Sequence, residues 1–265
     1  MYEKRNRILI DTRAVIDPKA ELAHDVSVGA YSIIGADVQI ESGTWIGPHV
    51  VLKGPMKIGH NNKIYQFASL GENPQDKKYN GEPNTSVEIG NNNEIREYCT
   101  INRGTIQGGG ITRIGDNNWI MAYCHIAHDC IVHNNTIFAN GASLAGHVEI
   151  EDCVILGGFA LIHQFCIMGI YSFAAPTSLI FKDVLPYVMV CGNRAEANGL
   201  NKEGLKRQGL SSDTIRALNQ AYKIIYKQNM LKDQAIAALE ELSTQYSEVR
   251  KMQQCLQNSK RGIVR

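Results

Sequence analysis

Aliphatic residues recur at every sixth position through most of the first 170 residues of this sequence. The longest unbroken series is Ile16, Leu22, Val28, Ile34, Ile40, Ile46, Leu52, Ile58, Ile64 and Leu70. The series resumes at Ile89 and again from Ile114 to Met168. An α-helix needs a period near 3.6, whereas six is the period of a hexapeptide β-helix. The chain is therefore predicted to coil into a triangular prism filled by these aliphatic residues.

Three hexads close one coil, so each residue is expected to stack on the residue eighteen positions later, about 4.8 Å away. The position two before each aliphatic residue is usually small, which predicts that Cys124, Cys130 and Cys166 are slim core residues. No C-x-x-C pair occurs among the seven cysteines, so neither a disulfide framework nor a zinc ribbon is indicated. Glycine often follows the aliphatic residue, as at Gly29, and we expect it there to serve unusual backbone angles.

The repeat also predicts the domains. We expect a β-helix over residues 1–190, with loop excursions near 72–86 and 103–113, and a C-terminal α-helical domain over 191–265. Loops that leave a solenoid tend to build its binding face. The triple glycine at 108–110 is typical of a flexible loop.

The last part of the chain has the apolar period of helices. Ile215, Leu218 and Tyr222 lie on one stripe after Ser211 or Ser212, either of which could be the N-cap. The strings KDQAIAALEELSTQ and SEVRKMQQCLQNS predict two more helices. Such a domain would cover the open end of the prism.

Charge and hydropathy exclude some classes of protein. The net charge of +1 argues against a nucleic-acid-binding protein. Residues 200–265, however, carry 12 basic and 6 acidic residues, and this local excess favours an anionic partner near that end. The longest apolar stretch, VILGGFALI, is far shorter than the roughly 20 residues that span a bilayer, and no apolar region of a secretory signal follows the basic start. We therefore expect a cytoplasmic protein without membrane insertion.

The string CHIAHDC, residues 124–130, contains the first candidate site. The hexad turns its cysteines inward and its histidines outward. A step of eighteen carries His128 to Gly146 and then to Gln164, and places His147 next to Asp129. One prism edge is thus predicted to gather the following residues: His125, His128, Asp129, Gly146, His147, His163 and Gln164. An imidazole oriented by a carboxylate can act as a general base, and three imidazoles can instead bind zinc. The residues alone leave both possibilities open.

Several strings are similar to those of the UDP-N-acetylglucosamine acyltransferase family, which begins lipid A synthesis. They are HIAHDC, LAGHVEI, IHQFCIMG, NPQDKKYNGEP, INRGTIQGGG and NKEGLKRQGL, and they cover nearly the whole chain in the same order. The resemblance implies an all-β left-handed parallel β-helix, a hexapeptide repeat solenoid, with a C-terminal α-helical domain. It also implies transfer of an (R)-3-hydroxyacyl group from acyl carrier protein to the 3-hydroxyl of UDP-N-acetylglucosamine.

The resemblance further implies a role for each matching residue. His128 would be the general base, Asp129 would orient it, and the Gly146 N–H would stabilise the oxyanion. The residues implied to bind substrate are Asp76, Lys78, His125, His147, His163, Gln164, Asn201, Glu203 and Arg207. Pro176 takes the place of the residue that limits acyl length, which is glycine in the most familiar members, so a bulkier side chain is expected to shorten or redirect the acyl tunnel.

The same resemblance implies a homotrimer with sites between subunits, no metal, and no cofactor beyond the phosphopantetheine of acyl carrier protein. Three alternatives to this family are considered. The related pathway N-acyltransferase has an extra N-terminal domain, for which a repeat that begins by Ile16 leaves no room. A zinc-dependent hydratase resembling γ-carbonic anhydrase would use the histidines as metal ligands. A purely structural solenoid would not need clustered histidines and two excursions.

Overall fold

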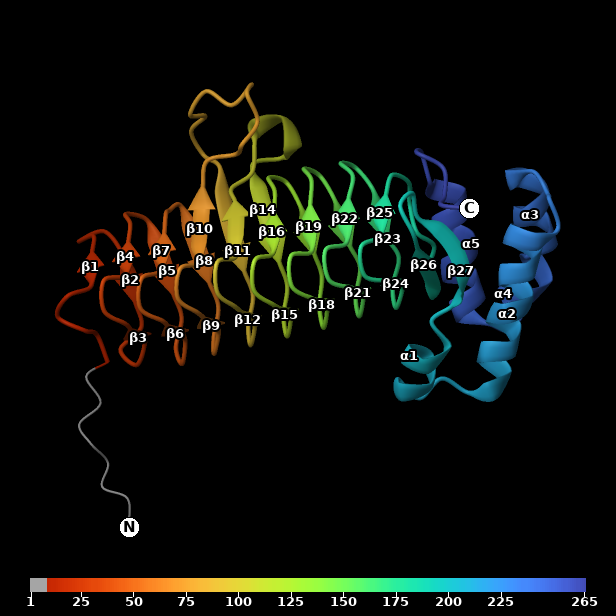
Figure 1. The fold of residues 1–265 in the computed structure, drawn as a ribbon, viewed down its shortest axis with the longest axis horizontal. Helices are drawn as coiled ribbons and strands as arrows, with labels where there is room; N and C mark the ends of the chain where they lie inside the picture. Colours follow the sequence, from red (N-terminus) through yellow and green to blue (C-terminus); the bar gives the residue numbers. More distant parts are fainter. Residues whose placement is uncertain (1–8) are drawn as a thin grey trace, which may run out of the picture.

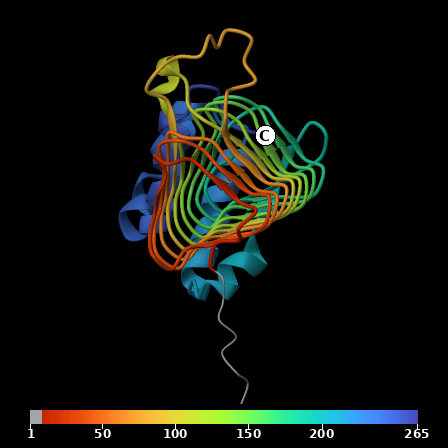
Figure 2. The same cartoon turned by 90° about the vertical axis from the view of Figure 1, so that its left-hand side faces the viewer.

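The computed structural model describes residues 9–265. The chain winds into a parallel β-helix of triangular cross-section, and helices pack at its C-terminal end (Figures 1 and 2). Three sheets form the faces of the prism, and we name each sheet after its first strand. Each coil contributes one short strand to each face.

The β1 sheet contains β1 (Val15–Ile16), β4 (Ile33–Ile34), β7 (Val51–Leu52), β10 (Ser69–Glu72), β13 (Thr100–Asn102), β16 (His125–Ile126), β19 (Ser143–Leu144), β22 (Leu161–Ile162) and β25 (Leu179–Ile180). The β2 sheet contains β2 (Glu21–Leu22), β5 (Val38–Ile40), β8 (Met56–Ile58), β11 (Ser86–Ile89), β14 (Ile111–Ile114), β17 (Ile131–Val132), β20 (Glu149–Ile150) and β23 (Ile167–Met168). The β3 sheet contains β3 (Ser27–Val28), β6 (Trp45–Ile46), β9 (Lys63–Ile64), β12 (Glu94–Ile95), β15 (Trp119–Ile120), β18 (Ile137–Phe138), β21 (Ile155–Leu156), β24 (Phe173–Ala174), β26 (Val188–Cys191) and β27 (Glu196–Leu200).

The strand register confirms the step of eighteen. Ile126 pairs with Leu144, Leu144 with Ile162, and Ile162 with Ile180. From Val28 onward the predicted aliphatic positions are buried, each no more than 3% exposed, and Cys124, Cys130 and Cys166 are buried with them. Burying one such side chain stabilises the fold by about 1.5–3 kcal/mol, so the repeated aliphatic column is the main source of stability.

The role predicted for the glycines after the aliphatic residues is wrong at Gly29, although Gly71, which follows Leu70, does have a positive φ of 85°. Positive φ occurs three positions after the aliphatic residue, at residues such as Tyr31 (φ 62°) and Asp129 (φ 60°). Gly29 has no positive φ; a Cβ there would lie 2.5 Å from the backbone nitrogen of Pro48 on the next coil. Glycine is therefore needed at this position because successive coils approach closely, not because the turn needs a left-handed residue.

A polar ladder inside the prism was not predicted. Thr44, Asn62, Asn93, Asn118 and Thr136 occupy successive coils, and all five are buried. Asn118 Oδ1 accepts from both the backbone N–H and the hydroxyl of Thr136, at 2.9 and 2.7 Å, and the Asn118 N–H donates to Asn93 Oδ1 at 2.9 Å. Because an unpaired buried amide is costly, this ladder penalises any slip of one coil against the next.

Both excursions leave the same edge of the prism, between the β1 and β2 sheets (Figures 1 and 2). The first spans residues 73–85, between β10 and β11. The second spans residues 103–110, between β13 and β14, and contains the short 3₁₀-helix η1 (Ile106–Gly108). The second excursion is shorter than predicted, because β14 already begins at Ile111.

The C-terminal part begins with strands. The antiparallel pair β26 and β27 runs on to Leu200, past the predicted boundary at residue 190. The helices are α1 (Lys202–Arg207), α2 (Ser212–Lys227), α3 (Lys232–Ala238), α4 (Glu240–Gln245) and α5 (Ser247–Asn258). Ser211 caps α2 by accepting from the Thr214 N–H at 3.1 Å.

One predicted helix is divided into two. The string KDQAIAALEELSTQ forms α3 and α4, which meet at Leu239. The helical part packs on the last strands: the Tyr222 hydroxyl donates to the Ala197 carbonyl at 3.0 Å and accepts from the Gly199 N–H at 2.9 Å. Within residues 9–265, no helix combines the length and the apolarity needed to cross a membrane.

Candidate active site

The edge between the β1 and β2 sheets carries a cavity of about 640 Å³ next to both excursions. His128 and Asp129 lie where β16 turns into β17 on this edge. The lining of the cavity comes from the prism and from both excursions: Gln75, Asp76, Lys78, Tyr79, Glu82, Asn102, Thr105, Gln107, His125, Ala127, His128, His147, Gln164 and Phe165. The predicted convergence of separate coils and loops at one edge is therefore present in the structure.

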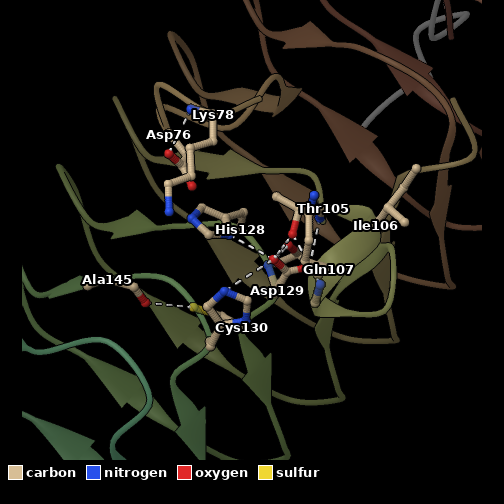
Figure 3. Close-up of polar contacts among 12 residues, drawn as sticks. Asp76, Lys78, Thr105, Ile106, Gln107, His128, Asp129, Cys130 and Ala145 are labelled. Atoms are coloured by element: carbon tan, nitrogen blue, oxygen red, sulfur yellow. Dashed lines mark hydrogen bonds and ion pairs between the residues drawn. The ribbon is translucent and has the colours of Figure 1, made fainter. Parts of the chain in front are cut away.

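His128 and Asp129 form a hydrogen-bonded pair. His128 Nδ1 contacts Asp129 Oδ2 (Figure 3), at a distance of 2.7 Å. The His128 side chain is 15% exposed, and the Asp129 side chain is fully covered. An ionised carboxylate can only accept hydrogen bonds, so Nδ1 carries the proton and the lone pair of Nε2 is free to take another. This is the tautomer that a histidine general base requires.

Thr105 of the second excursion covers Asp129 and holds its carboxylate. The Thr105 N–H donates to Oδ1 and the Thr105 hydroxyl to Oδ2, each at 2.7 Å (Figure 3). Burial alone would raise the pKa of Asp129, but the hydrogen bonds from His128 and Thr105 outweigh it and lower the pKa below its ordinary value. Asp129 is therefore ionised at neutral pH and acts as a fixed negative charge behind His128.

The other two cavity histidines are held neutral. Burial lowers the pKa of His125, whose Nδ1 lies 2.7 Å from the Thr100 hydroxyl. Burial is also the largest cause of the lowered pKa of His147. The His147 ring stacks on Phe165, with centroids 4.4 Å apart, and its Nε2 lies 3.7 Å from Asp129 Oδ2. Neutral imidazoles at these positions can donate or accept hydrogen bonds without repelling a protonated His128.

Gly146 lies against the ring of His128, one coil further along. A Cβ on Gly146 would come within 2.6 Å of His128 Cε1 and 2.7 Å of Nε2. Among the hydrogen bonds of residues 9–265, the Gly146 N–H donates none. An unpaired backbone donor next to the free nitrogen of a base is suited to stabilise a developing oxyanion.

The first excursion brings Asp76 and Lys78 to the cavity. The Lys78 N–H donates to Asp76 Oδ1 at 2.9 Å, and the Tyr79 N–H donates to the Asp76 carbonyl at 3.0 Å. The loop thereby turns back over the prism edge, and both side chains lie on the same side of His128 (Figure 3). One cation and one anion beside several imidazoles can bind a polar, hydroxyl-rich ligand.

Other predicted site residues do not line this cavity within one chain. His163 lies on the same edge, but its ring packs against Phe181, with centroids 5.4 Å apart, and its Nδ1 lies 3.3 Å from Arg261. Pro176 lies on a different edge, in the turn from β24 to β25. Asn201, Glu203 and Arg207 lie at or within α1, at the far end of the molecule (Figure 1).

The α1 residues have structural contacts of their own. Asn201 caps α1 by accepting from the Gly204 N–H at 3.2 Å, and it donates to the Tyr171 carbonyl at 3.1 Å. Glu203 pairs with Lys206 at 3.1 Å on the exposed side of the helix. A single chain therefore does not unite these residues with His128.

Sequence reasoning missed several residues that line the cavity, and two of them, Phe165 and Thr105, contact His147 and Asp129 directly. Phe165 could have been found, because a step of eighteen from His147 leads directly to it. Thr105 could not, because the excursion breaks the repeat and no spacing rule links residue 105 to residue 129. The first residue of the triple glycine is needed for a close contact: a Cβ on Gly108 would overlap the Asp129 carboxylate, which packs against it.

The zinc hypothesis can be compared with the donor set. Within residues 9–265, the one group able to offer three close ligand atoms consists of His128, Asp129 and His147, two imidazoles and a carboxylate rather than three imidazoles. Asp129 Oδ2 already accepts at 2.7 Å from both His128 and Thr105, so a metal ion would have to displace the hydrogen bond that orients His128. The geometry favours acid–base chemistry.

Comparisons with known proteins agree with this geometry. Residues 111–146 match the model of the bacterial transferase hexapeptide (six repeats), and residues 183–264 match that of Udp N-acetylglucosamine O-acyltransferase, domain 2. The acyl-[acyl-carrier-protein]–UDP-N-acetylglucosamine O-acyltransferase of Herminiimonas arsenicoxydans is 51% identical over 261 residues, with 97% of this chain and 99% of that protein covered. The protein of the same name from Thiobacillus denitrificans is 52% identical over 256 residues, with the same coverage.

Solved structures give the same result. The LpxA structure from Acinetobacter baumannii superposes with a TM-score of 0.95 at 50% identity and covers 97% of this chain and 100% of that chain. The UDP-N-acetylglucosamine O-acyltransferase from Moraxella catarrhalis does so with a TM-score of 0.95 at 47% identity and the same coverage. The predicted left-handed parallel β-helix with C-terminal helices is confirmed, and neither the hydratase nor the N-acyltransferase is favoured. The chain belongs to the acyl-[acyl-carrier-protein]–UDP-N-acetylglucosamine O-acyltransferase family.

Proposed function

We propose that this enzyme transfers an (R)-3-hydroxyacyl group from acyl carrier protein to the 3-hydroxyl of UDP-N-acetylglucosamine, the first step of lipid A biosynthesis. The observation that carries the proposal is the His128–Asp129 pair, which leaves the His128 Nε2 lone pair beside the free Gly146 N–H. A base and an oxyanion donor at one point are what acyl transfer to a hydroxyl requires.

The proposed reaction has two steps. His128 Nε2 takes the proton of the sugar 3-hydroxyl as its oxygen attacks the thioester carbonyl carbon, and the Gly146 N–H donates to the resulting oxyanion. The tetrahedral intermediate then collapses, the carbon–sulfur bond breaks, and the leaving thiolate takes the proton from the His128 imidazolium. Asp129 stabilises that imidazolium without itself taking the proton. The thioester supplies the driving force, and we propose that no metal and no cofactor other than the phosphopantetheine of the donor takes part.

The cavity side chains are assigned to the sugar and to the acyl group. Asp76 and Lys78 would hold the sugar from the first excursion, and both line the cavity. His125, His147 and Gln164 would contact the sugar and the start of the acyl chain, and they line it too. We assign His163 to the acyl donor, since it lies on the same edge beside Gln164, one coil beyond Gly146.

We propose that the enzyme is a homotrimer whose sites lie between subunits. The edge between the β3 and β1 sheets carries a ladder of stacked rings, Tyr31, His49, Phe67, Tyr98 and Tyr123, whose adjacent centroids are 4.9 to 5.2 Å apart. Four of these rings are 46–62% exposed: Tyr31, Phe67, Tyr98 and Tyr123. A contiguous exposed apolar stripe is unusual on a monomeric protein and favours a contact with another protein.

A neighbouring subunit would complete the site. Pro176 lies on the edge that carries the ladder, so a subunit that docks through this edge could bring Pro176 to the acyl chain held by its neighbour. Asn201, Glu203 and Arg207, which a single chain keeps away from His128, would likewise bind the nucleotide from a second subunit. Acyl carrier protein is acidic, and the basic residues of 200–265 would favour its encounter. Both proposed substrates are cytoplasmic molecules, so we assign the reaction to the cytoplasm.

One experiment tests this function. Metal-stripped enzyme is incubated with chelator, UDP-N-acetylglucosamine and 3-hydroxyacyl carrier proteins of several lengths, with product trapping. Wild type should transfer the acyl group, and His128→Ala should lower the rate by roughly 10²- to 10⁴-fold. His133→Ala is the matched control, because His133 pairs with Glu149 at 3.1 Å on a different edge and should keep its activity. A requirement for zinc, or no transfer with any acyl length, would rule the function out.

A further inference from the structure

The hydrogen bonds between the two excursions all involve the Glu82 carboxylate, while the Asn84 carbonyl of the first excursion packs near Gly110 of the second. Glu82 of the first excursion accepts from the Ile106 N–H at 3.1 Å, and its other oxygen lies 3.5 Å from Gln107 Nε2. Ile106 and Gln107 belong to η1 in the second excursion. Glu82 is thus the point at which the loop that carries Asp76 and Lys78 is joined to the loop that carries Thr105.

Thr105 links the contact made by Glu82 to the general base. Its N–H and its hydroxyl both donate to the Asp129 carboxylate at 2.7 Å, and Asp129 in turn holds His128 Nδ1 at 2.7 Å. Hydrogen bonds at both ends of the Thr105–Ile106 backbone therefore connect Glu82 to Asp129 and, through Asp129, to His128. Thr105 is buried, so water does not substitute readily for either of its donors.

The second excursion is built to keep Thr105 in one position. The Thr105 hydroxyl also accepts from the Gly108 N–H at 3.2 Å, and the Thr105 carbonyl accepts from the Gly110 N–H at 2.7 Å. The Asp129 carboxylate occupies the space that a side chain on Gly108 would need. This close packing leaves the carboxylate little freedom to rotate once Thr105 is in place.

We propose that Thr105 and Glu82 are positioning residues that join the sugar-holding loop to the catalytic pair. Thr105 fixes the Asp129 carboxylate, and Glu82 fixes η1 and hence Thr105. Neither residue exchanges a proton with the substrate. The proposal rests on the proposed acyl transfer, and it adds that the first excursion and the base are ordered together rather than independently.

The variants separate the two contacts. Thr105→Val keeps the shape and the backbone N–H but removes the hydroxyl donor, and it should lower kcat by roughly 10- to 100-fold with little change in the KM for the sugar nucleotide. Thr105→Ser restores the hydroxyl and should return kcat to near the wild-type value. Glu82→Ala should lower kcat and raise the KM for the sugar nucleotide, because both loops lose their anchor. Glu82→Gln keeps an acceptor for the Ile106 N–H and should remain close to wild type.

Glu88→Ala is the matched control, since Glu88 pairs with Arg113 at 3.0 Å on the exposed β2 sheet and should change neither constant. In the double variant of Thr105→Val and Glu82→Ala, the loss in kcat should be smaller than the product of the two single losses, because both substitutions interrupt one chain. Wild-type transfer in the same assay establishes the proposed function separately.

Three results would overturn the proposal while wild type remains active. They are a wild-type kcat in Thr105→Val, no recovery in Thr105→Ser, or fully multiplicative losses in the double variant. If Thr105→Val has a lowered unfolding temperature, its low kcat could reflect partial unfolding. The recovery of kcat in Thr105→Ser and the kcat of Glu82→Ala then decide whether Thr105 and Glu82 position the catalytic pair.

Discussion

The His128 ring packs directly against Gly146: a Cβ on Gly146 would lie 2.6 Å from His128 Cε1 and 2.7 Å from His128 Nε2. The step of eighteen brings the two residues together on adjacent coils, and β-helix geometry keeps such neighbours about 4.8 Å apart. The ring can approach the backbone this closely only if residue 146 has no side chain. The same contact sets the distance between the proposed base and the proposed oxyanion donor.

Gly146→Ala should therefore displace the His128 ring without disturbing the prism core. A shift of about 1 Å in a catalytic group can cost on the order of 100-fold in rate, and we expect a fall of that size in kcat. His133→Ala is again the control, because His133 pairs with Glu149 at 3.1 Å on the edge between the β2 and β3 sheets, away from the site. Steady-state kinetics and thermal unfolding of both variants check this, and full activity of Gly146→Ala would contradict the arrangement.

The lowered pKa of Asp129 predicts a pH-dependent contribution to stability. A carboxyl group whose pKa is lower in the folded than in the unfolded chain stabilises the fold above its ordinary value of 3.8, and this stabilisation is lost as the pH falls through the folded value. The difference in urea midpoint between wild type and Asp129→Asn should thus be largest near neutral pH and should narrow below about pH 4. A difference that stays constant down to acid pH would show that the charge of Asp129 does not contribute.

The hexad period predicted much of the fold and part of the site. It placed His128, Gly146 and Gln164 on one edge and Cys124 and Cys130 inside, because a solenoid converts sequence spacing directly into spatial position. Resemblance to a family, not spacing, singled out His128 among the outward histidines. The hydrogen bond between His128 Nδ1 and Asp129 now gives a physical reason for that choice.

The contacts of the excursions could not be predicted in the same way. Residues 73–85 and 103–110 leave the repeat, so no rule of spacing relates Glu82 or Thr105 to Asp129. The positions of Pro176 and Asn201 show a second limit, because what they contact depends on how copies of the chain associate. The polar ladder through Asn118 shows a third, since the small interior position was expected to hold slim residues rather than hydrogen-bonding amides.

His125 should make the enzyme less stable below neutral pH. Burial lowers the pKa of His125 in the folded chain, so the unfolded chain binds a proton more readily once the pH falls below the ordinary value of 6.5. The folded state loses stability from that pH down to the folded pKa. His125→Gln can keep a hydrogen bond to Thr100 but cannot titrate, and it should lose less stability than wild type between about pH 7 and pH 5. Urea unfolding at several pH values measures this, and parallel pH curves for the two proteins would refute it.

Pro176 offers a test of acyl-length selection that depends on the neighbouring subunit. Its ring is exposed in a single chain, on the edge of the aromatic ladder, so in the proposed trimer it would meet the acyl chain bound at the next subunit. Pro176→Gly removes that ring and should shift the preferred acyl group to a longer chain in a competition assay with 3-hydroxyacyl carrier proteins of graded length. Pro18→Gly is the matched control, because Pro18 is also an exposed turn proline but lies on the first coil, far from the site along the prism. An unchanged length preference in Pro176→Gly would mean that another residue closes the acyl tunnel.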